Sequence, residues 1–395
     1  MSRIDELIAE HCPAGVEHKT LGDVGQFIRG NGLQKKDLFH EGFPAIHYGQ
    51  LHTLYGVSAS ETLSFTTPEL ASKLRHARHG DLLIATTSED DEAVAKATAW
   101  LGGTEVVLSG DAFIYRHELE PRYVSYYFQS RQFQDQKQRH VSGTKVRRIS
   151  GSSLAKLIIP VPPLEIQRHI ADILDTFSKM EAELEAELEA RKQQYEHYRS
   201  VLVSNSQTGD QLSLGEIENR GIIKLGRGKV ISKMALDATP GNYPVYSSSG
   251  TGTGEFGRYG DYMFDDERIT WSVDGGGRFF YRHPHKFSVT NVSGWMTVDT
   301  SVLNVKYLYY VLTTQWEKQE FNYTRKAHPS VIRDVYSISL PPLGDQEEVV
   351  QALDNFDALV NDNSTGLPAE LAVRSQQYEY YRDKLLTFKE LEPVS

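Results

Sequence analysis

The sequence has a single cysteine among its 395 residues and lacks any long uninterrupted apolar run. One cysteine, Cys12, cannot form an intrachain disulfide and is too few for a cysteine-based zinc site. A membrane-spanning helix needs about 20 mainly apolar residues. Near the N-terminus, Asp5, Glu6 and Glu10 occupy positions where a signal peptide requires an apolar segment. These absences favour a cytoplasmic protein, and its length favours two or three domains of roughly 100–200 residues each.

The chain also lacks an excess of positive charge. Its 42 Lys and Arg residues stand against 53 Asp and Glu residues, which gives a net charge of −11. An acidic total argues against nucleic-acid binding, because nucleic acids prefer basic surfaces. The negative charge is concentrated in residues 161–205, with a net charge of −4, and in residues 340–395, with −7. The two long remaining segments are nearly neutral, so each can still present a local basic surface.

Catalytic signatures are equally scarce. Residues 252–257, GTGEFG, have the spacing of a dinucleotide-binding loop, but that motif needs a strand before it and a helix after it, and both flanks here are typical of loops. Residues 226–229, GRGK, lack the first glycine and the Ser or Thr of a phosphate-binding loop. His283 and His285 have no third metal ligand at a useful spacing. We therefore expect no catalytic residues and no metal site, and we interpret 252–257 as a Gly-rich turn or a DNA-facing loop.

The sequence does contain an internal repeat. Residues 162–177, PPLEIQRHIADILDTF, recur in part as PPLGDQEEVVQALDNF at 341–356. A second block, RKQQYEHYRSVL at 191–202, recurs as RSQQYEYYRDKL at 374–385. Apolar residues three and four positions apart predict long helices with one apolar stripe. Such a helix needs a partner, and the obvious partner of each copy is the other copy.

The repeat divides the chain into four segments: a first domain at 1–160, a central helical repeat at 161–205, a second domain at 206–340 and a C-terminal helical repeat at 341–395. We expect an α+β protein in which two mixed α/β domains are separated by two long antiparallel helices, with an internal pseudo-two-fold axis. Residues 363–368, NSTGLP, interrupt the second copy and predict two helical pieces. Short runs at 269–273, 279–282 and 287–292 predict strands, and residues 104–116 predict a hairpin.

Basic and polar residues gather at equivalent places in the two long domains. Residues 131–148 and 318–333 are basic clusters at the end of each domain, and in each domain an Arg-Gly pair follows a Leu-Gly-Asp or Leu-Gly-Glu motif. Lys and Arg can neutralise phosphates, while polar side chains in loops can read base edges. The alternative is ordinary solvated charge. The candidate DNA-binding residues are Arg29, Asn31, Lys35, Lys36, Lys145, Arg147, Arg148, Arg227, Lys229, Ser248, Thr251, Arg278, Arg325 and Lys326.

The repeated helices provide a second set of candidates, which either pack the helices together or contact a partner protein. We interpret the tyrosines among them as packing residues, with partner contact as the alternative. The carboxylate run at 181–189 is interpreted as a solvated helix face, with a docking surface for a basic partner as the alternative. The candidate helix residues are Leu164, Gln167, Leu174, Phe177, Leu184, Leu188, Tyr195, Tyr198, Leu343, Gln346, Leu353, Phe356, Tyr378 and Tyr381.

The two PPL-x-x-Q…LD-x-F blocks and the two QQYE-x-YR blocks resemble the specificity subunit of type I restriction–modification systems, as do the EAELEAEL and GLPAELA runs. The resemblance covers essentially the whole chain. It implies a non-catalytic, sequence-specific DNA-recognition subunit for phage defence, in which each domain reads one half of a bipartite asymmetric site. Its implied partners are double-stranded DNA, two copies of a methyltransferase (modification) subunit that methylates adenine, and two copies of a restriction (motor-endonuclease) subunit.

The resemblance also implies that S-adenosylmethionine, ATP and Mg²⁺ belong to those partners, so we expect no cofactor in this chain. Helices of fixed length would act as a spacer between the half-sites. One EAEL unit corresponds to about 6 Å of helix, so deletion of Glu185–Leu188 is expected to change the spacing. The alternative is a coiled-coil scaffold whose two domains bind ligands other than DNA, and that alternative gives no reason for the basic clusters.

Overall fold

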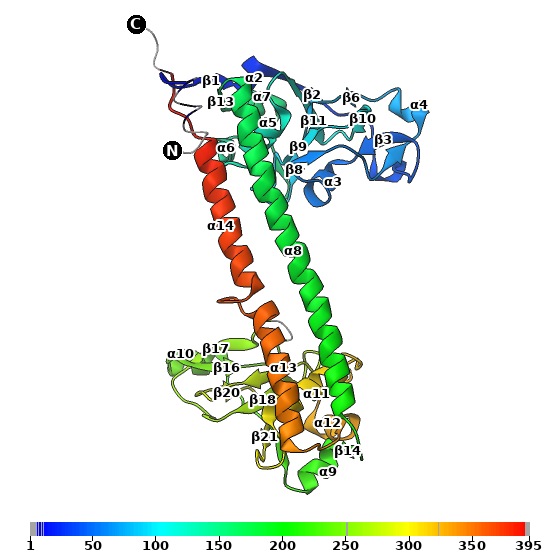
Figure 1. Ribbon diagram of the computed structural model, residues 1–395, viewed down its shortest axis with the longest axis vertical. Helices are drawn as coiled ribbons and strands as arrows, with labels where there is room; N and C mark the ends of the chain where they lie inside the picture. The colour runs from blue at the N-terminus through cyan, green and yellow to red at the C-terminus, as the bar shows by residue number, and fades with distance from the viewer. Residues whose placement is uncertain are drawn as a thin grey trace. The chain divides into compact units, whose positions relative to one another are not determined.

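The computed structural model describes residues 12–249, 252–322 and 324–391, together with Glu6, Ile8 and Glu10. Its internal contacts divide the chain into two compact units (Figure 1). Unit 1 comprises Met1–Leu184 and Leu371–Ser395, and unit 2 comprises Glu185–Glu370. The long helix α8 (Leu164–Ser206) begins in unit 1 and ends in unit 2. Within the described residues, no helix is both long and apolar enough to cross a bilayer.

Unit 1 is built around a five-stranded sheet of order β2-β11-β7-β9-β4, in which the β4–β9 pair is parallel and the other pairs are antiparallel. A second sheet has the order β5-β3-β10-β6, and β1-β13 and β12-β8 form two-stranded pairs. The strands are β1 (Glu17–Thr20), β2 (Gly25–Arg29), β3 (Phe43–Ile46), β4 (Ser58–Ala59), β5 (Phe65–Thr66), β6 (His76–Ala77), β7 (Leu82–Ala85), β8 (Thr87–Ser88), β9 (Ala97–Trp100), β10 (Val106–Leu108), β11 (Ala112–His117), β12 (Arg147–Arg148) and β13 (Ile158–Val161).

The core of unit 1 forms where helices cover the first sheet. Strands β7 and β9 are buried along their whole length, which fits central strands with both faces covered. Tyrosines of α5 pack against this core, and the hydroxyl of Tyr123 donates to the carbonyl of Pro160 at 3.0 Å. The helices of unit 1 are α2 (Leu21–Val24), η1 (Lys35–Asp37), α3 (Tyr48–Thr53), α4 (Pro68–Ala71), α5 (Pro121–Gln129), α6 (Arg131–Gln138), α7 (Gly151–Leu154), the first half of α8 and most of α14 (Leu367–Leu385).

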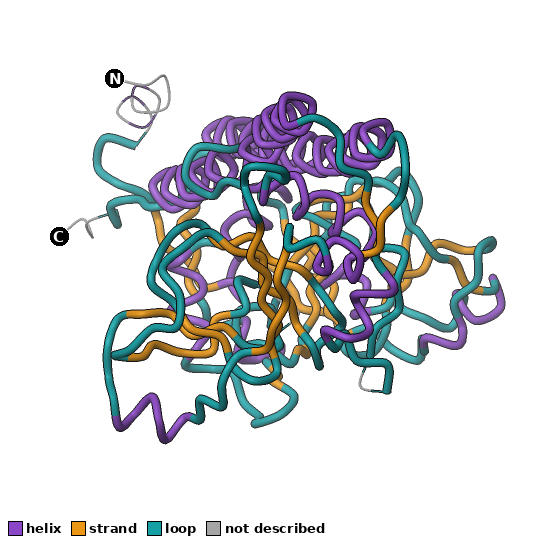
Figure 2. The backbone as a smooth tube through the Cα atoms, turned by 90° about the horizontal axis from the view of Figure 1, so that it is seen from below, coloured by secondary structure: helices purple, strands orange, loops and turns teal. Residues whose placement is uncertain are grey.

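Unit 2 has a four-stranded antiparallel sheet of order β15-β21-β18-β19, a three-stranded sheet of order β17-β16-β20 and the pair β14-β22. Outside the helices, much of the fold consists of strands connected by loops (Figure 2). The elements of unit 2 are β14 (Leu212–Ser213), α9 (Leu214–Asn219), β15 (Ile223–Arg227), α10 (Lys233–Ala238), β16 (Tyr243–Tyr246), β17 (Glu255–Tyr259), β18 (Arg268–Ser272), β19 (Phe279–Arg282), β20 (Ser288–Val289), β21 (Ser293–Val298), α11 (Val305–Trp316), α12 (Pro329–Val335), β22 (Ser337–Ile338) and α13 (Leu343–Asn361).

The interruption of the second helical copy is confirmed. Helix α13 ends at Asn361 and α14 begins at Leu367. Between them, the Asp362 carboxylate accepts hydrogen bonds from the backbone and hydroxyl of Ser364 and from the hydroxyl of Thr365. These bonds lower the pKa of Asp362 to about 2 and compete with continuation of the helix.

Two strand expectations need correction. The hairpin predicted at 104–116 is wrong, because β10 belongs to the second sheet of unit 1 and β11 to the first. The Ser-Gly-Asp turn between them therefore carries the chain from one sheet to the other. The run predicted at 287–292 forms a strand only at Ser288–Val289, since the chain then turns into β21. The strands expected at 269–273 and 279–282 are confirmed to within one residue.

Candidate nucleic-acid interface

In each unit, a glutamine at the equivalent position of the repeat joins the domain to its helix. In unit 1, the Gln167 side chain accepts a hydrogen bond from the Glu120 backbone at 2.9 Å and donates to the Pro162 carbonyl at 2.7 Å. In unit 2, Gln346 accepts from the Asn304 backbone at 2.8 Å and donates to the Pro341 carbonyl at 2.7 Å. Both glutamines are buried, so the repeated PPL-x-x-Q block is explained by an intrachain joint.

An aspartate at the equivalent position of each repeat also binds the helix to its domain. Asp175 accepts hydrogen bonds from the Tyr126 hydroxyl at 2.7 Å and from the Arg122 guanidinium at 2.6 Å. In unit 2, Asp354 accepts from the Tyr310 hydroxyl and from the Lys306 ammonium group, each at 2.6 Å. A cation and a tyrosine thus converge on the equivalent carboxylate in both units.

The helix blocks pair crosswise. In unit 1, Phe177 of the first block stacks on Tyr381 of the last block, with ring centroids 5.5 Å apart. In unit 2, Phe356 stacks on Tyr198 at 5.3 Å. Each unit therefore combines the PPL block of one copy with the QQYE block of the other, and the paired segments run antiparallel within it. The expected packing of each helical copy against the other is confirmed.

The structure sorts the helix candidates by accessibility. Leu164, Tyr198 and Tyr381 are exposed, whereas Phe177, Leu184, Leu343 and Phe356 are half-buried. The others are buried within the chain: Gln167, Leu174, Leu188, Tyr195, Gln346, Leu353 and Tyr378. Burial in intrachain packing explains why the buried residues repeat, and it leaves the exposed aromatic residues as those that a second protein can reach.

The DNA-binding candidates of unit 1 collect at one end of its first sheet. Arg29 is the last residue of β2. Ala112, the first residue of β11, and Ala85, the last residue of β7, lie at the same end of the sheet. The loop of β12 joins this end, because Arg148 pairs with Thr87. We call this surface the Arg29 edge, and it comprises residues 29–36, 86–91, 109–111 and 142–148. It brings together Arg29, Asn31, Lys35, Lys36, Lys145, Arg147 and Arg148.

Unit 2 has an equivalent surface, the Arg227 edge, which comprises residues 227–234, 272–278, 290–292 and 325–327. Arg227 ends β15 at the place where β21 begins and β18 ends. Ala327 joins this end because its backbone donates to the Val273 carbonyl at 3.0 Å. Arg227, Lys229, Arg278, Arg325 and Lys326 lie here. Ser248 lies beside it, since its carbonyl accepts from Ser272 at 2.7 Å, and Thr251 lies outside the described residues.

The two Arg-Gly pairs are built alike. The Nε atoms of Arg29 and Arg227 donate to the carbonyls of Gly110 and Asn291, each at 2.9 Å. A Cβ atom on Gly30 would lie 2.2 Å from the Ser109 carbonyl, and one on Gly228 would lie 2.1 Å from the Val289 carbonyl. Only glycine permits this close approach of two backbone segments. The arginine is thereby fixed at the rim of each edge, and in Arg227 a second guanidinium nitrogen also donates to the Asn291 carbonyl.

Several cations at these edges already have protein partners. Arg147 pairs with Asp91 at 2.9 Å, and Lys326 pairs with Asp274 at 3.1 Å. The Asn31 side chain bonds to the backbones of Arg75 and Lys73 and shapes the loop beside Arg29. Sequence reasoning missed these two basic neighbours, because no motif marks the segment between α4 and β6.

Lys137 does not belong to the basic surface, although it lies in the basic cluster at 131–148. It is fully buried, and its ammonium group donates to the carbonyls of Glu92 and Val94 at 2.9 and 2.8 Å. Burial lowers its pKa to about 8. Lys137 therefore positions the 89–95 loop, in which Ala95 has a positive φ of 66°, and this loop carries the partner of Arg147.

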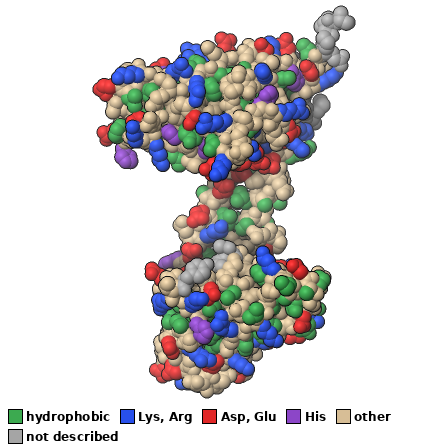
Figure 3. Space-filling view, turned by 180° about the vertical axis from the view of Figure 1, so that it is seen from behind, with side chains coloured by type: hydrophobic (Ala, Val, Ile, Leu, Met, Phe, Trp, Pro, Cys, Tyr) green, Lys and Arg blue, Asp and Glu red, His purple; other side chains and the backbone are tan. Residues whose placement is uncertain are grey.

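Charge elsewhere on the surface is mixed. Figure 3 shows Lys and Arg side chains interspersed with Asp and Glu on the visible face of both units. No group of three or more potential metal ligands occurs within the described residues. The GTGEFG segment leads directly into β17 rather than into a helix, which fits a Gly-rich turn and not a dinucleotide loop. The His285 ring is occupied by contacts to Tyr246 and to the His283 carbonyl.

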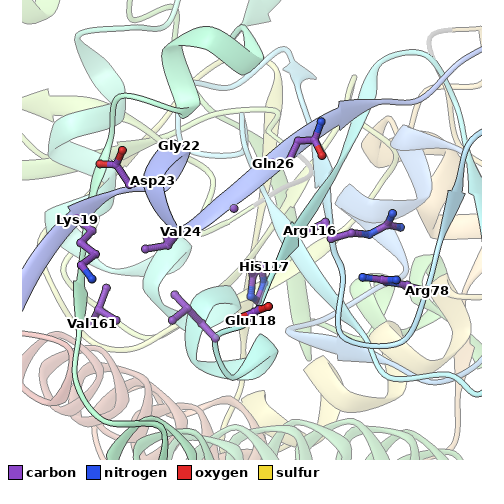
Figure 4. A pocket seen from close by; sticks show the side chains of 12 residues that line it. Lys19, Gly22, Asp23, Val24, Gln26, Arg78, Arg116, His117, Glu118 and Val161 are labelled. Atoms are coloured by element: carbon purple, nitrogen blue, oxygen red, sulfur yellow. The ribbon is translucent and has the colours of Figure 1, made fainter.

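The opposite end of the first sheet of unit 1 carries a charged pocket of about 630 Å³ (Figure 4). Lys19, Asp23, Arg78 and Arg116 line it together with His117. Arg116 is neutralised by Asp81, with a closest contact of 2.7 Å. Because the pocket lies at the other end of the strands, its cations do not add to the Arg29 edge.

His117 makes unit 1 sensitive to acid. Burial lowers its pKa from 6.5 to about 4, so between these values the unfolded chain binds a proton that the folded chain does not. Stability should fall as the pH drops from 6.5 to 4, by at most about 1.4 kcal/mol per pH unit. Urea unfolding of His117→Phe across this range is expected to show a shallower pH dependence. Leu119→Ala, in the same pocket, should shift the curve by a constant amount, and an unchanged slope in His117→Phe would contradict the assignment.

Two α+β domains with equivalent sheet edges, each joined through the same contacts to a pair of antiparallel helix segments, define a duplicated two-domain recognition protein. The family model of the type I restriction modification DNA specificity domain matches twice, at residues 13–191 and 214–373. The chain belongs to this family. Specificity subunits of the family are non-catalytic.

Similar proteins carry the same description. A putative type I specificity subunit of Mycoplasma pneumoniae is 36% identical over 236 residues, which cover 58% of this chain and 92% of the relative. A type I restriction enzyme specificity subunit of Escherichia coli is 29% identical over 277 residues, 62% of this chain and 67% of the relative. The crystal structure of an S subunit from M. genitalium covers 94% of this chain and 96% of its own, at 14% identity and a TM-score of 0.56, and so shares its fold.

Proposed function

We propose that the chain is the sequence-specific DNA-recognition subunit of a type I restriction–modification complex and that each edge reads one half of a bipartite asymmetric site. The observation that carries this proposal is the matched construction of the two edges. Both anchor an Arg-Gly pair on a turn carbonyl, yet the side chains around that anchor differ. The common scaffold supports the same docking on duplex DNA, and the different side chains support two different half-sites.

The roles of the candidates follow from their exposure and pairing. Lys35, Lys36, Lys145 and Arg148 are exposed, and among the described residues no carboxylate lies within 4.0 Å of their charged groups. We assign them to phosphate contacts, which set affinity and its salt dependence. Arg29 and Arg227 are held more rigidly, and a fixed guanidinium is suited to bidentate recognition of guanine.

The partners follow from the family. We propose two methyltransferase subunits that methylate adenine and two restriction subunits, with S-adenosylmethionine, ATP and Mg²⁺ bound by those partners and none by this chain. The two units present equivalent exposed aromatic residues, Tyr198 and Tyr381, at the helix pairs. Equivalent surfaces of this kind support the binding of two copies of one partner.

Sequencing of adenine methylation tests the proposal directly. Genomic DNA is compared between cells that carry the gene, cells that lack it, and deletion cells that carry it on a plasmid. One motif with two separated half-sites should lose methylation in the deletion strain and regain it on complementation. Co-purification of a methyltransferase with the tagged chain is the second readout. Unchanged methylation together with no bound methyltransferase would favour the scaffold alternative.

We also propose that helix length sets the spacing between half-sites. Helix α8 is continuous over 43 residues, and deletion of Glu185–Leu188 removes about 6 Å of rise and leaves a rotation of about 40°. The deletion is expected to change the number of unspecified base pairs in the methylated motif while both half-sites are retained. The double substitution Glu185→Ala and Glu187→Ala, which keeps the helix length, should leave the spacer unchanged. An unchanged spacer in the deletion variant would refute this role.

A further inference from the structure

The Arg227 edge carries an unusual pair of side chains. Val230 is 79% exposed and Met234 is 80% exposed, and these are the two most exposed large hydrophobic side chains that the structure describes. They lie four residues apart: Val230 precedes α10, and Met234 is the second residue of that helix. Large apolar side chains left open to water in this way are often sites of contact with another molecule.

The surroundings of this pair are basic. Arg227, Lys229 and Lys233 flank it, and no acidic residue occurs between Gly226 and Leu236. Among the described residues, none of these three cations forms an ion pair within 4.0 Å. Two apolar side chains between cations without ion-pair partners are complementary to a nucleic acid. A nucleic acid presents phosphates on the outside, and apolar base faces and thymine methyl groups within its grooves.

The segment is held firmly at its base. The Lys229 backbone donates to the Val289 carbonyl at 3.2 Å, and Ser232 caps α10 by accepting from the Ala235 backbone at 3.2 Å. Leu236 packs on the backbone of β17, where a Cβ atom on Gly257 would come within 2.6 Å of its Cδ1 atom. Because Leu236 occupies the inner side of α10, Met234 is left on the outer side.

The Arg29 edge has the same scaffold without the apolar tip. Counting from the two Arg-Gly pairs, Gly32 takes the place of Val230, and Lys36 takes the place of Met234. Gln34 precedes η1 as Ser232 precedes α10. The two edges therefore differ in chemistry at matched positions, which is where two half-sites of different sequence would be distinguished.

We propose that Val230 and Met234 form an apolar recognition tip that is buried against the bases of the half-site read by unit 2. The inference rests on the proposed function and adds the residues and the kind of contact. The tip meets either thymine methyl groups in the major groove or an opened base step in the minor groove. Lys229 and Lys233 hold the flanking phosphates, and the corresponding contacts of unit 1 are polar.

The test uses the complex of this chain with its methyltransferase subunits. Fluorescence anisotropy measures binding to the methylated site, to duplexes with either half-site scrambled, and to an unrelated duplex, over a range of salt. Val230→Thr with Met234→Gln is expected to weaken binding to the full site about tenfold or more. Binding to the unrelated duplex and the salt slope should stay unchanged. Lys229→Gln with Lys233→Gln should weaken binding to all duplexes and reduce the salt slope.

Controls separate the possible failures. Leu63→Gln, at a 63% exposed apolar residue of unit 1, should leave binding unaffected. Replacing thymine by uracil in the half-site should reproduce the loss if the contact is a methyl group, and 2-aminopurine fluorescence should rise on binding if a base step opens. A wild-type complex that cannot distinguish the site from the unrelated duplex would refute the proposed function. Three results for the Val230→Thr and Met234→Gln variant would overturn this inference alone. They are normal discrimination between the full site and the unrelated duplex, an equal loss of affinity for both duplexes, or a change in assembly of the complex without a change in DNA binding.

Discussion

Removal of residues 386–395 is expected to unfold unit 1 while leaving unit 2 folded. Leu386 is fully buried and Phe388 is 9% exposed, and both belong to the core formed by the first domain. The chain here also bonds to the N-terminal segment, since the backbones of Val16 and Leu391 donate to the carbonyls of Lys389 and Val16, each at 2.9 Å. Leu386→Ala and Phe388→Ala should each cost about 2–5 kcal/mol, a large share of the stability of a typical domain.

Hydrogen exchange is the suitable measurement because it reports each unit separately. Peptides from β7 and β11 should lose protection in the truncated chain and in Phe388→Ala, whereas peptides from β18 and β21 should keep it. Tyr380→Ala, at a 62% exposed residue of the same C-terminal segment, is the matched control and should change little. Loss of protection in both units alike, or in neither, would contradict the assignment of the C-terminus to the core of unit 1.

The second large effect is expected at the two repeated aspartates. Asp175→Ala removes the acceptor of Tyr126 and Arg122, and Asp354→Ala removes the acceptor of Tyr310 and Lys306. Charged hydrogen bonds contribute about 1.5–3 kcal/mol each, and partial exposure of both carboxylates reduces this. We expect a loss of about 2 kcal/mol in each case, confined to the unit that carries the substitution.

Urea unfolding followed by hydrogen exchange can check this pair. Asp175→Ala should loosen α5 and the first half of α8, and Asp354→Ala should loosen α11 and α13. Asp172→Ala is the control, because the Asp172 side chain is 63% exposed and its carboxylate, among the described residues, accepts only from Arg122, which keeps its bonds to Glu120 and Asp175. If Asp175→Ala destabilised unit 2 as much as unit 1, the prediction that each aspartate stabilises only its own unit would be wrong.

Both effects depend on the crosswise pairing of the repeat. Each unit takes its PPL block from one copy and its QQYE block from the other, so the C-terminal residues complete the first domain rather than a separate one. A linear division of the chain at residue 340 would miss this. It follows that unit 1 depends on the contact between Val16 and the segment that carries Lys389 and Leu391.

The duplication and the helices could be predicted from the sequence because each produces a repeated or periodic pattern of residues. Identical residues recur at fixed separations, and apolar residues spaced three and four apart mark one face of a helix. The break before α14 was readable from NSTGLP, since Gly, Pro and short polar residues compete with helical hydrogen bonds. These are local properties, and the structure confirms them.

The sheet order and the surroundings of the candidate residues were decided only by tertiary structure. Residues 104–116 have the pattern of a hairpin, yet β10 and β11 pair with strands distant in sequence, and no local pattern encodes such partners. Lys137 lies in a basic stretch that is typical of an exposed surface, but in the folded chain it is buried and bonds to two backbone carbonyls. The repeated Gln and Asp residues were recognisable as a motif, whereas the domain residues that they contact lie more than 40 positions away in the sequence. Sequence by itself determined that this protein is duplicated and helical at its repeats. Tertiary structure decided which side chains meet, because burial and pairing are properties of the folded neighbourhood and not of the segment.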